Sequence, residues 1–501
     1  MLMFESSLKK RYGIKLLASV VSGVIGMILV AIVPKAIGPV SYGQFVYLQQ
    51  FFSKIISFLD ASSSIAFFTK ISANNKRKEL IGFYLYYTLF ILLSLVFFIA
   101  FFNYFDLTKY ILPEVESKYF YLALFFSFLT WFVQIATKVS DAYALTVYVE
   151  IMKIIHKFMS LVLLIYVISF FSLNLSVYLY LNIATLLIFV FCVIWIFKSG
   201  EIVGMNVLVF DLSVCKSIFR EFLSYCSPLF AYSTLALILG LFDIWLLQHI
   251  SGAEETGYYG VSYSIAAMCF VFTGAMTPII TREFSQAYEI KDIESMRILF
   301  ARYIPMLYSI ATYFSIFIVF ESENVLEIFT GDEFRNAFYV LIVMAFYPIH
   351  QTYGQLSGSI FYATGRTRLY RNIGVLGMFI GAALTIIFLF VLEMGALGLA
   401  MKLVIAQFIT VNIHLFYNTK LLELKFVHFF KHQILAIIVF GTIAYISTSF
   451  VNMAAPFPDF ILSGLLYTIF SVFVFFVYPS LFSISKTELS GIISNVRKRW
   501  S

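Results

Sequence analysis

The sequence predicts an all-α, polytopic membrane protein with about fourteen transmembrane helices. Two observations predict this class: 61% of the residues are apolar and only 12% are charged, and the apolar residues form runs of about 20. No soluble domain could bury that much apolar surface. None of the runs alternates with a period of two, so the pattern does not indicate a β-barrel.

The apolar runs mark where each membrane span is expected. They cover residues 14–34, 44–68, 80–103, 119–137, 144–171, 174–197, 224–249, 257–281, 302–320, 337–363, 373–391, 395–418, 433–451 and 460–483. Each run is long enough to cross the hydrocarbon core as a helix.

The distribution of Lys and Arg predicts the orientation of these spans. Most of these residues lie at the amino terminus, in the even-numbered linkers and in the tail, among them Lys9, Lys10, Arg77, Lys198, Arg366, Lys420 and Lys498. The odd-numbered linkers hold only Lys35, Lys109, Lys118 and Arg335. The positive-inside rule therefore predicts that both termini are cytoplasmic. The net charge of +7 follows from this topology and indicates no nucleic-acid partner.

A short motif that occurs twice predicts an internal repeat. Gly38 to Gly43 and Gly252 to Gly257 both read Gly, four residues, Gly, and each motif lies between two apolar runs. We expect two six-helix lobes, related as parallel repeats, around a central cavity. The predicted divisions are an amino-terminal lobe at 1–197, an amphipathic cytoplasmic linker at 198–222 with Asp211 as its N-cap, a second lobe at 223–418, and two further helices with a basic tail at 419–501.

Motifs for catalysis, nucleotide binding and metal binding are not found in the sequence. There is no phosphate-cradling Gly-rich loop, no His-Glu-x-x-His and no Gly-x-Ser-x-Gly. The four cysteines form no Cys-x-x-Cys pair, so we expect neither a disulfide nor a metal site. External loops of at most roughly fifteen residues leave little room for a catalytic domain. We therefore predict a protein that is not an enzyme and has no cofactor.

Polar side chains inside the predicted spans are the candidate functional residues, because each ionisable group there costs a few kcal/mol unless it faces water or a partner. The excess of lysine predicts a cationic cavity that suits an anionic substrate such as a pyrophosphate. The candidates are Lys54, Lys153, Lys157, Lys402, Gln50, Gln351, Gln355 and His350 for substrate, and Asp60, Asp243 and Glu150 for a coupling ion. His350 could instead be a hydrogen-bonded packing group.

Several candidates also have a structural interpretation. Glu150 and Lys153 lie three residues apart, so they could form an ion pair that only joins helices. Lys157 lies near the cytoplasmic side, where its ammonium could reach lipid headgroups. Asp60 and Asp243 could neutralise the lysines, bind a coupling cation or link helices.

Five segments, taken in chain order, resemble the polysaccharide flippases of the multidrug/oligosaccharidyl-lipid/polysaccharide exporter superfamily. The segments are Ala36 to Phe45, Asp243 with Gly252 to Tyr259, Thr330 to Phe334, Ala363 to Thr367, and Gly395 to Gly398. The resemblance covers nearly the whole chain and implies two six-helix lobes in a V shape with a central cavity.

The resemblance also implies a function. It implies transport of undecaprenyl-pyrophosphate-linked oligosaccharide units, for O-antigen, capsule or a related polymer, across a bacterial inner membrane by alternating access. A proton or sodium ion is the expected coupling ion, and a polysaccharide polymerase and chain-length machinery are possible partners beside membrane lipids. The alternatives are a drug or small-molecule antiporter of the same superfamily and a membrane glycosyltransferase or polymerase.

Overall fold

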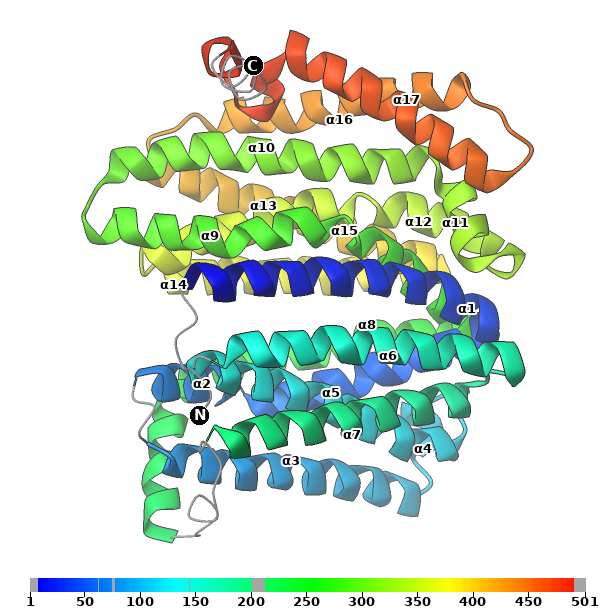
Figure 1. Ribbon diagram of the computed structural model, residues 1–501, viewed down its shortest axis with the longest axis vertical. Coiled ribbons are helices and arrows are strands. Elements are labelled where there is room, and N and C mark those ends of the chain that lie inside the picture. Colours follow the sequence, from blue (N-terminus) through cyan, green and yellow to red (C-terminus); the bar gives the residue numbers. More distant parts are fainter. Residues whose placement is uncertain (1–7, 62, 74–76, 144, 201–211, 491–501) are drawn as a thin grey trace. The chain divides into compact units, whose positions relative to one another are not determined.

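The computed structural model describes residues 8–61, 63–73, 77–143, 145–200 and 212–490 (Figure 1). Within these ranges every regular element is a helix. Eleven of the described helices are long and apolar enough to cross a membrane. The expected class of polytopic, all-α membrane protein is confirmed.

Two very long helices each contain one break at a glycine of the repeated motif. Helix α1 spans Leu8–Asp60 and is interrupted at Gly38, with φ 77° and ψ 166°. Helix α8 spans Leu212–Ala267 and is interrupted at Gly252, with φ 87° and ψ 177°. Only glycine adopts this region without strain, so the first glycine of each motif ends one helical segment and lets the next begin in a new direction.

These breaks reconcile the eleven helices with the fourteen predicted spans. Each break divides one helix into two segments, and the second segment of α8 continues into α9, Phe270–Glu289. The tenth predicted span is formed by α12, Phe338–Met344, and α13, Tyr347–Ala363. The described helices thus account for every predicted run.

Contacts divide the chain into two compact units. Unit 1 comprises Met1–Leu29 and Ala36–Gly257, and unit 2 comprises Val30–Lys35 and Tyr258–Ser501. The lobe boundaries expected from the sequence, including the linker, stay predictions. Asp211, the expected N-cap of that linker, lies outside the described residues.

Unit 1 is built around helix α5. Besides parts of α1 and α8, it contains α2 Ser63–Ala73, α3 Glu79–Tyr104, α4 Thr108–Ile111, α5 Ser117–Ala142, α6 Thr146–Phe170 and α7 Leu175–Ser199. Helix α5 packs against α2, α3, α6 and α7. Of the residues in its most apolar stretch, 56% are buried, whereas in the corresponding stretch of α6 only 17% are buried. Most apolar side chains in that stretch of α6 are therefore not fully covered within the described protein.

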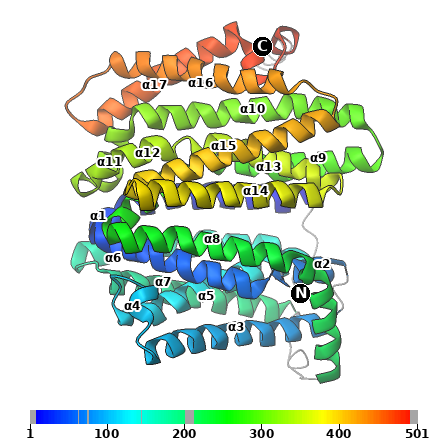
Figure 2. The same cartoon turned by 180° about the vertical axis from the view of Figure 1, so that it is seen from behind.

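The first turns of α8 also pack on unit 1. Ile218 and Phe222 lie four residues apart and are both buried, while Phe219 and Leu223 are exposed. The ring of Phe222 contacts those of Phe83 and Tyr84 on α3. This stretch is therefore a helix with one buried face, and Figure 2 shows the same helix continuing along unit 1.

Unit 2 is built around helices α10 and α13. Its helices are α9, α10 Ile293–Phe320, α11 Ser322–Thr330, α12, α13, α14 Thr367–Thr385, α15 Gly395–Leu421, α16 Phe426–Ser449 and α17 Pro456–Val477; η2 Asp332–Ala337, the π-helical η3 Ile386–Val391 and η4 Pro479–Phe482 are short. Helix α10 lies between α9 and α16 (Figure 1), and α15 lies beside α14 (Figure 2) and α13. Phe300, Tyr308 and Tyr353 are fully buried where α10 meets α13 and α16.

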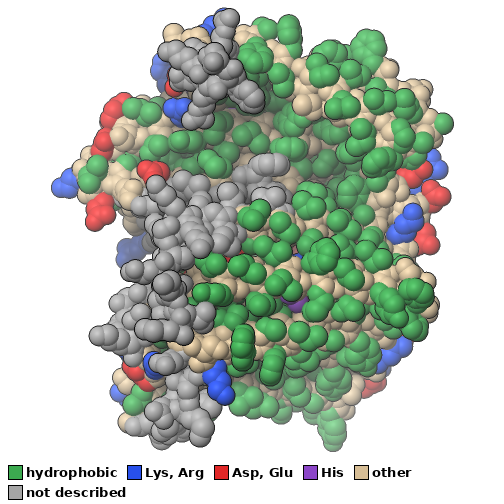
Figure 3. Space-filling model, in the orientation of Figure 1, with side chains coloured by type: hydrophobic (Ala, Val, Ile, Leu, Met, Phe, Trp, Pro, Cys, Tyr) green, Lys and Arg blue, Asp and Glu red, His purple; other side chains and the backbone are tan. Residues whose placement is uncertain are grey.

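Large hydrophobic side chains cover the lengths of the outer helices in both units. Phe97 on α3, Phe191 on α7 and Phe473 on α17 are all more than 60% exposed. Figure 3 shows hydrophobic side chains over the helices and charged side chains gathered near helix ends. This distribution fits helices that face lipid along their length and water at their ends.

Candidate functional site

In unit 1, the ammonium group of Lys54 lies against a glycine of α8. Lys54 is half-buried on the second segment of α1. A Cβ added to Gly240 would lie 2.6 Å from Lys54 Nζ, which is closer than real Cβ contacts. The missing side chain at Gly240 therefore makes the space that the ammonium occupies. Gln50 lies one turn before Lys54, so both side chains belong to one side of this segment.

Unit 2 accommodates its buried lysine in the same way. Lys402 is half-buried on α15, and a Cβ added to Gly381 on α14 would lie 2.9 Å from Lys402 Cε and 3.5 Å from its Nζ. The sequence identified both lysines as candidates, but it gave no signal for the two glycines that face them. Each unit thus holds one lysine of a membrane span over a glycine of the neighbouring helix.

Helix α6 carries the charged candidates Glu150, Lys153 and Lys157 of unit 1. Lys153 Nζ lies 3.0 Å from Glu150 Oε1, and the Glu150 side chain is almost fully buried. Lys157 is half-buried one turn further along. The neighbouring ring of His156 lies 5.2 Å from that of Phe189 on α7. The Glu150–Lys153 ion pair therefore forms within α6 and joins no two helices, and the roles of both residues stay predictions.

Asp60 is the centre of a buried polar network in unit 1. Its carboxylate accepts hydrogen bonds from the Ser63 hydroxyl, from the backbone N–H and hydroxyl of Ser64, and from the Tyr84 hydroxyl, at 2.8–3.0 Å. Lys138 Nζ donates to the Ser64 hydroxyl at 2.9 Å. The carboxylate satisfies the first turn of α2 and joins it to α3, so its burial has a structural cause.

The break in α8 is fixed by a residue that the sequence did not single out. Glu114 Oε2 accepts a hydrogen bond from the backbone N–H of Ala253 at 2.7 Å, directly after Gly252. Its own carbonyl accepts from Gln44 Nε2 at 2.6 Å. A carboxylate at the start of a helical segment is favourable because it meets unpaired N–H groups. Asp243 lies on the preceding segment of α8 and is half-buried.

The second glycines of the two motifs allow the backbones of α1 and α8 to come into contact within unit 1. A Cβ added to Gly43 would lie 1.7 Å from the carbonyl oxygen of Ala253. A Cβ added to Gly257 would lie 2.4 Å from the carbonyl oxygen of Pro39. The two contacts are equivalent, because each second glycine faces the carbonyl of the residue that follows the first glycine of the other motif. Neither position tolerates a side chain without movement of the backbone.

The polar candidates of unit 2 lie along α13. The Gln351 side-chain oxygen accepts a hydrogen bond from Gln407 on α15, and the Gln355 oxygen accepts from the Thr277 hydroxyl on α9 at 3.3 Å. His350 is buried with its ring 4.9 Å from that of Phe408. The structure brings these groups into one unit, and their roles in substrate binding stay predictions.

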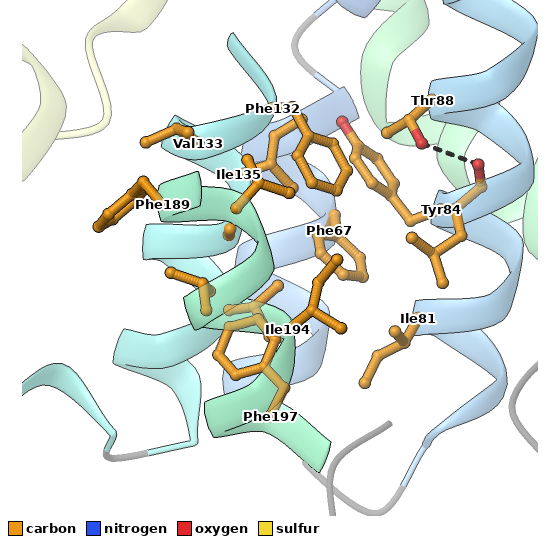
Figure 4. A pocket seen from close by; sticks show the side chains of 15 residues that line it. Phe67, Ile81, Tyr84, Thr88, Phe132, Val133, Ile135, Phe189, Ile194 and Phe197 are labelled. Atoms are coloured by element: carbon orange, nitrogen blue, oxygen red, sulfur yellow. Dashed lines mark hydrogen bonds between the residues drawn. The ribbon is translucent and has the colours of Figure 1, made fainter. Parts of the chain in front are cut away.

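Unit 1 also contains an apolar cavity of about 230 Å³ between α2, α3, α5 and α7. Phe67, Tyr84 and Phe132 line one side in Figure 4, and Phe189 and Phe197 line the other. Almost all of the cavity surface is apolar. Such a lining suits an aliphatic chain or a small apolar molecule better than a polar ligand.

Solved structures share this arrangement of helices. The lipid II flippase MurJ, in an inward closed conformation, is similar with a TM-score of 0.69 and 15% identity, over 92% of this chain and 98% of that one. An inward-facing multidrug resistance MATE family transporter of the MOP superfamily is similar with a TM-score of 0.58 and 13% identity, over 84% and 96%. The chain therefore shares the fold of these solved structures.

Two further proteins are similar to parts of this chain. A MOP superfamily transporter from Pyrococcus furiosus gives a TM-score of 0.57 with 13% identity, over 84% of this chain and 97% of that one. A probable low-salt glycan biosynthesis flippase of Haloferax volcanii is 24% identical over 201 residues, which are 39% of this chain and 42% of the relative. The chain therefore spans less than half the length of this relative. No family model matches the chain.

Proposed function

We propose that the protein is a flippase that moves a lipid-linked oligosaccharide from one leaflet of a membrane to the other by alternating access. The glycan-biosynthesis flippase among its relatives and the MOP fold both support this proposal. The proposed substrate is an undecaprenyl-pyrophosphate-linked repeat unit of O-antigen, capsule or a related polymer. The proposed setting is a bacterial inner membrane with both termini in the cytoplasm.

The observation that carries the proposal is that each unit makes room for a lysine ammonium within a membrane span. Lys54 lies over Gly240 and Lys402 over Gly381. An ammonium group within a span has the charge that attracts a pyrophosphate. Ser53 and Ser57 are exposed near Lys54, which suits a polar path better than lipid.

The remaining candidates take roles consistent with their chemistry. We assign Lys153 and Lys157 to the anionic group as well. Gln50, Gln351, Gln355 and His350 would hydrogen-bond the sugars, and Asp60, Asp243 or Glu150 would bind a coupling proton or sodium ion. The apolar cavity of unit 1 offers a site for part of the lipid chain. A polysaccharide polymerase and chain-length machinery are proposed partners.

A multidrug antiporter is the second candidate function, because the multidrug transporter fold covers 84% of this chain. Such a transporter of cationic drugs would need acidic groups free to bind them. The candidate residues of the spans instead include four lysines, Lys54, Lys153, Lys157 and Lys402, against the three acids Asp60, Asp243 and Glu150. This arrangement favours the anionic substrate.

The test is transfer of a fluorescent undecaprenyl-pyrophosphate oligosaccharide between leaflets of liposomes that contain the purified protein. Lys54→Ala removes the ammonium, and Gly240→Ala keeps the charge but fills its space. We expect transfer to fall at least several-fold in both variants. The matched controls are Lys109→Ala, which removes an exposed lysine, and Gly26→Ala, where no atom lies within 4 Å of the added methyl group.

Two results would overturn this proposal. One is wild-type protein that transfers no lipid-linked oligosaccharide under a proton or a sodium gradient. The other is wild-type transfer by folded Lys54→Ala and Lys402→Ala proteins. Uptake of cationic drugs by the same liposomes would then favour the antiporter.

A further inference from the structure

Three polar side chains at the contact of α13 and α15 are buried with atoms that have no partner. They are Ser357, His414 and Asn418, which are 0%, 5% and 0% exposed. Among the described residues, no hydrogen-bond partner is found for Ser357 Oγ, for Asn418 Oδ1 or for either ring nitrogen of His414. Buried polar groups are rarely left in this state, and bound water is the usual explanation.

The register of the two helices places the three side chains within about one turn. A Cβ added to Gly354 on α13 would lie 3.0 Å from Val411 Cγ2 on α15. Three residues further along each helix lie Ser357 and His414. Asn418, one turn after His414, donates from Nδ2 to the carbonyl of Ser357 at 3.0 Å. We call these three residues the buried polar turn.

Aromatic rings cover the imidazole of His414. The ring of Tyr370 on α14 is stacked on it at 5.1 Å and 18°, and the ring of Phe361 lies at 5.3 Å. Gly358 admits the Tyr370 ring, because a Cβ there would lie 3.3 Å from Tyr370 Cε2. The imidazole is thus held in place by packing, while its nitrogens remain available for a ligand.

The charged and titratable groups around the buried polar turn are few. Tyr370 is the titratable side chain that the described contacts place against His414 from α14. Arg368 and Arg371, which flank Tyr370 on α14, are exposed. Lys420, which follows His414 on α15, is also exposed. Helix α13 contributes Ser357 and Phe361. The two rings that contact His414, those of Tyr370 and Phe361, carry no fixed charge.

The unpartnered atoms are chemically complementary to water. A neutral imidazole offers one donor and one acceptor, an amide oxygen accepts, and a hydroxyl does both. A buried water needs two to four such partners. Imidazole is also the side chain that gains and loses a proton most readily near neutral pH.

We propose that the buried polar turn is a hydrated proton-binding site, in which Ser357 and Asn418 hold water and His414 accepts the proton. A hydronium ion gives its proton to a ring nitrogen of His414 and becomes water, and the reverse step returns the proton to bulk water. The link to transport rests on the proposed flippase function and makes the proton its coupling ion. The site itself does not depend on that function.

The first experiment measures the site directly. The chain has six histidines, so ¹⁵N-histidine labelling of the full-length protein in nanodiscs gives a tractable spectrum. The resonance that disappears in His414→Gln belongs to His414. If that variant does not fold, the resonance that moves most in Ser357→Ala identifies it. We expect this resonance to change from the neutral to the charged form as the pH is lowered from about 8 to about 4, and to show contact with water.

The second experiment measures proton coupling of oligosaccharide transfer in liposomes. We expect a proton gradient to speed transfer by the wild-type protein several-fold. The gradient should not speed transfer by the His414→Gln variant. The matched control is His432→Gln, because His432 is also buried in unit 2 but its Nε2 contacts the Leu481 carbonyl at 2.8 Å. This control should keep the response to the gradient.

The outcomes separate the two proposals. A His414 ring that stays neutral and dry across this pH range overturns the proton site, whatever the transport result. If the gradient speeds transfer by His414→Gln as much as transfer by the wild type, the role of His414 in coupling is overturned. A wild-type protein that transfers nothing overturns the flippase function, and the spectrum then still decides whether the site binds a proton.

Discussion

The two units satisfy their buried polar groups differently. In unit 1 the carboxylate of Asp60 accepts four hydrogen bonds, and Glu150 is paired with Lys153. In unit 2 the ring nitrogens of His414 have no partner among the described residues. Of the described buried side chains with unpartnered atoms, unit 1 holds Ser127 and Gln248, and the others lie in unit 2.

The difference follows the charge of the groups. An ionised side chain in a membrane span requires partners, because its desolvation is far more costly than that of a neutral group. Neutral hydroxyl, amide and imidazole groups cost only about 1–3 kcal/mol each when unpaired, and water can satisfy them. Unit 1 therefore contains a charged framework, formed by Asp60, Glu150 and their partners, whereas unit 2 holds neutral buried groups with no partner among the described residues.

Asp60→Ala gives the largest expected effect on this comparison. The change leaves Ser63, Ser64 and Tyr84 without their shared acceptor, so we expect a loss of about 3–5 kcal/mol, comparable to breaking a buried ion pair. The measurement is the thermal stability of detergent-solubilised protein. The control is Glu116→Ala, which removes an exposed carboxylate and should change stability by no more than about 0.5 kcal/mol. Equal melting temperatures for both variants would show that Asp60 does not contribute to the stability of the charged framework.

Gly43→Ala is expected to have the next largest effect. Its methyl group would lie 1.7 Å from the Ala253 backbone, and overpacking of this kind costs about 1–3 kcal/mol. Gly354→Ala in unit 2 meets the ends of the Gln407 and Val411 side chains at 2.9–3.0 Å, which can rotate, so it should cost less. Gly441→Ala meets nothing within 4 Å and should be neutral or stabilising. If Gly354→Ala proved the more damaging, unit 2 would be the more rigid unit.

Much of the fold could be predicted from the sequence, because each span is a local pattern. The fourteen apolar runs correspond to the described helices, and the Gly38 and Gly252 motifs coincide with the two helix breaks. The mutual contact of Gly43 with Ala253 could not be predicted. It depends on which segments meet across about 210 residues of chain, and a single sequence carries no record of such pairing.

The site was predictable only where a residue is unusual for its surroundings. Lys54 and Lys402 are charged residues within apolar runs, so the sequence alone identifies them. Gly240 and Gly381 are ordinary in membrane helices, and only the packing shows that they face the lysines. His414 also has no signal in the sequence, because its distinguishing feature is that neither ring nitrogen has a hydrogen-bond partner among the described residues.

A pair of serine substitutions sharpens the comparison at a smaller scale. Ser63→Ala removes hydroxyl contacts to Asp60 and Tyr84 in unit 1 and should cost about 1 kcal/mol. Ser471→Ala in unit 2 removes a buried hydroxyl with no partner in the described chain, so it should be neutral or stabilising. The measurement is the difference in melting temperature between the two variants. The reverse order would show that Ser471 is satisfied by something bound.

Glu221→Gln tests whether charge pairs at the surface of unit 1 belong to its framework. Glu221 lies at the start of α8, where hydrogen bonds from Arg77 and then Lys70 lower the pKa of its carboxyl group. Because this pKa is lower in the folded than in the unfolded protein, the pairs stabilise the fold above the unfolded pKa, and the gain is lost as the pH falls through the folded pKa. We therefore expect the wild type to melt at a slightly higher temperature than Glu221→Gln at pH 7, with a difference in the free energy of unfolding of less than about 1 kcal/mol. The difference in melting temperature should disappear in acid. Glu327→Gln, at an exposed residue of α11, is the matched control. A larger gap at pH 7 would extend the charged framework of unit 1 from the interior to its surface.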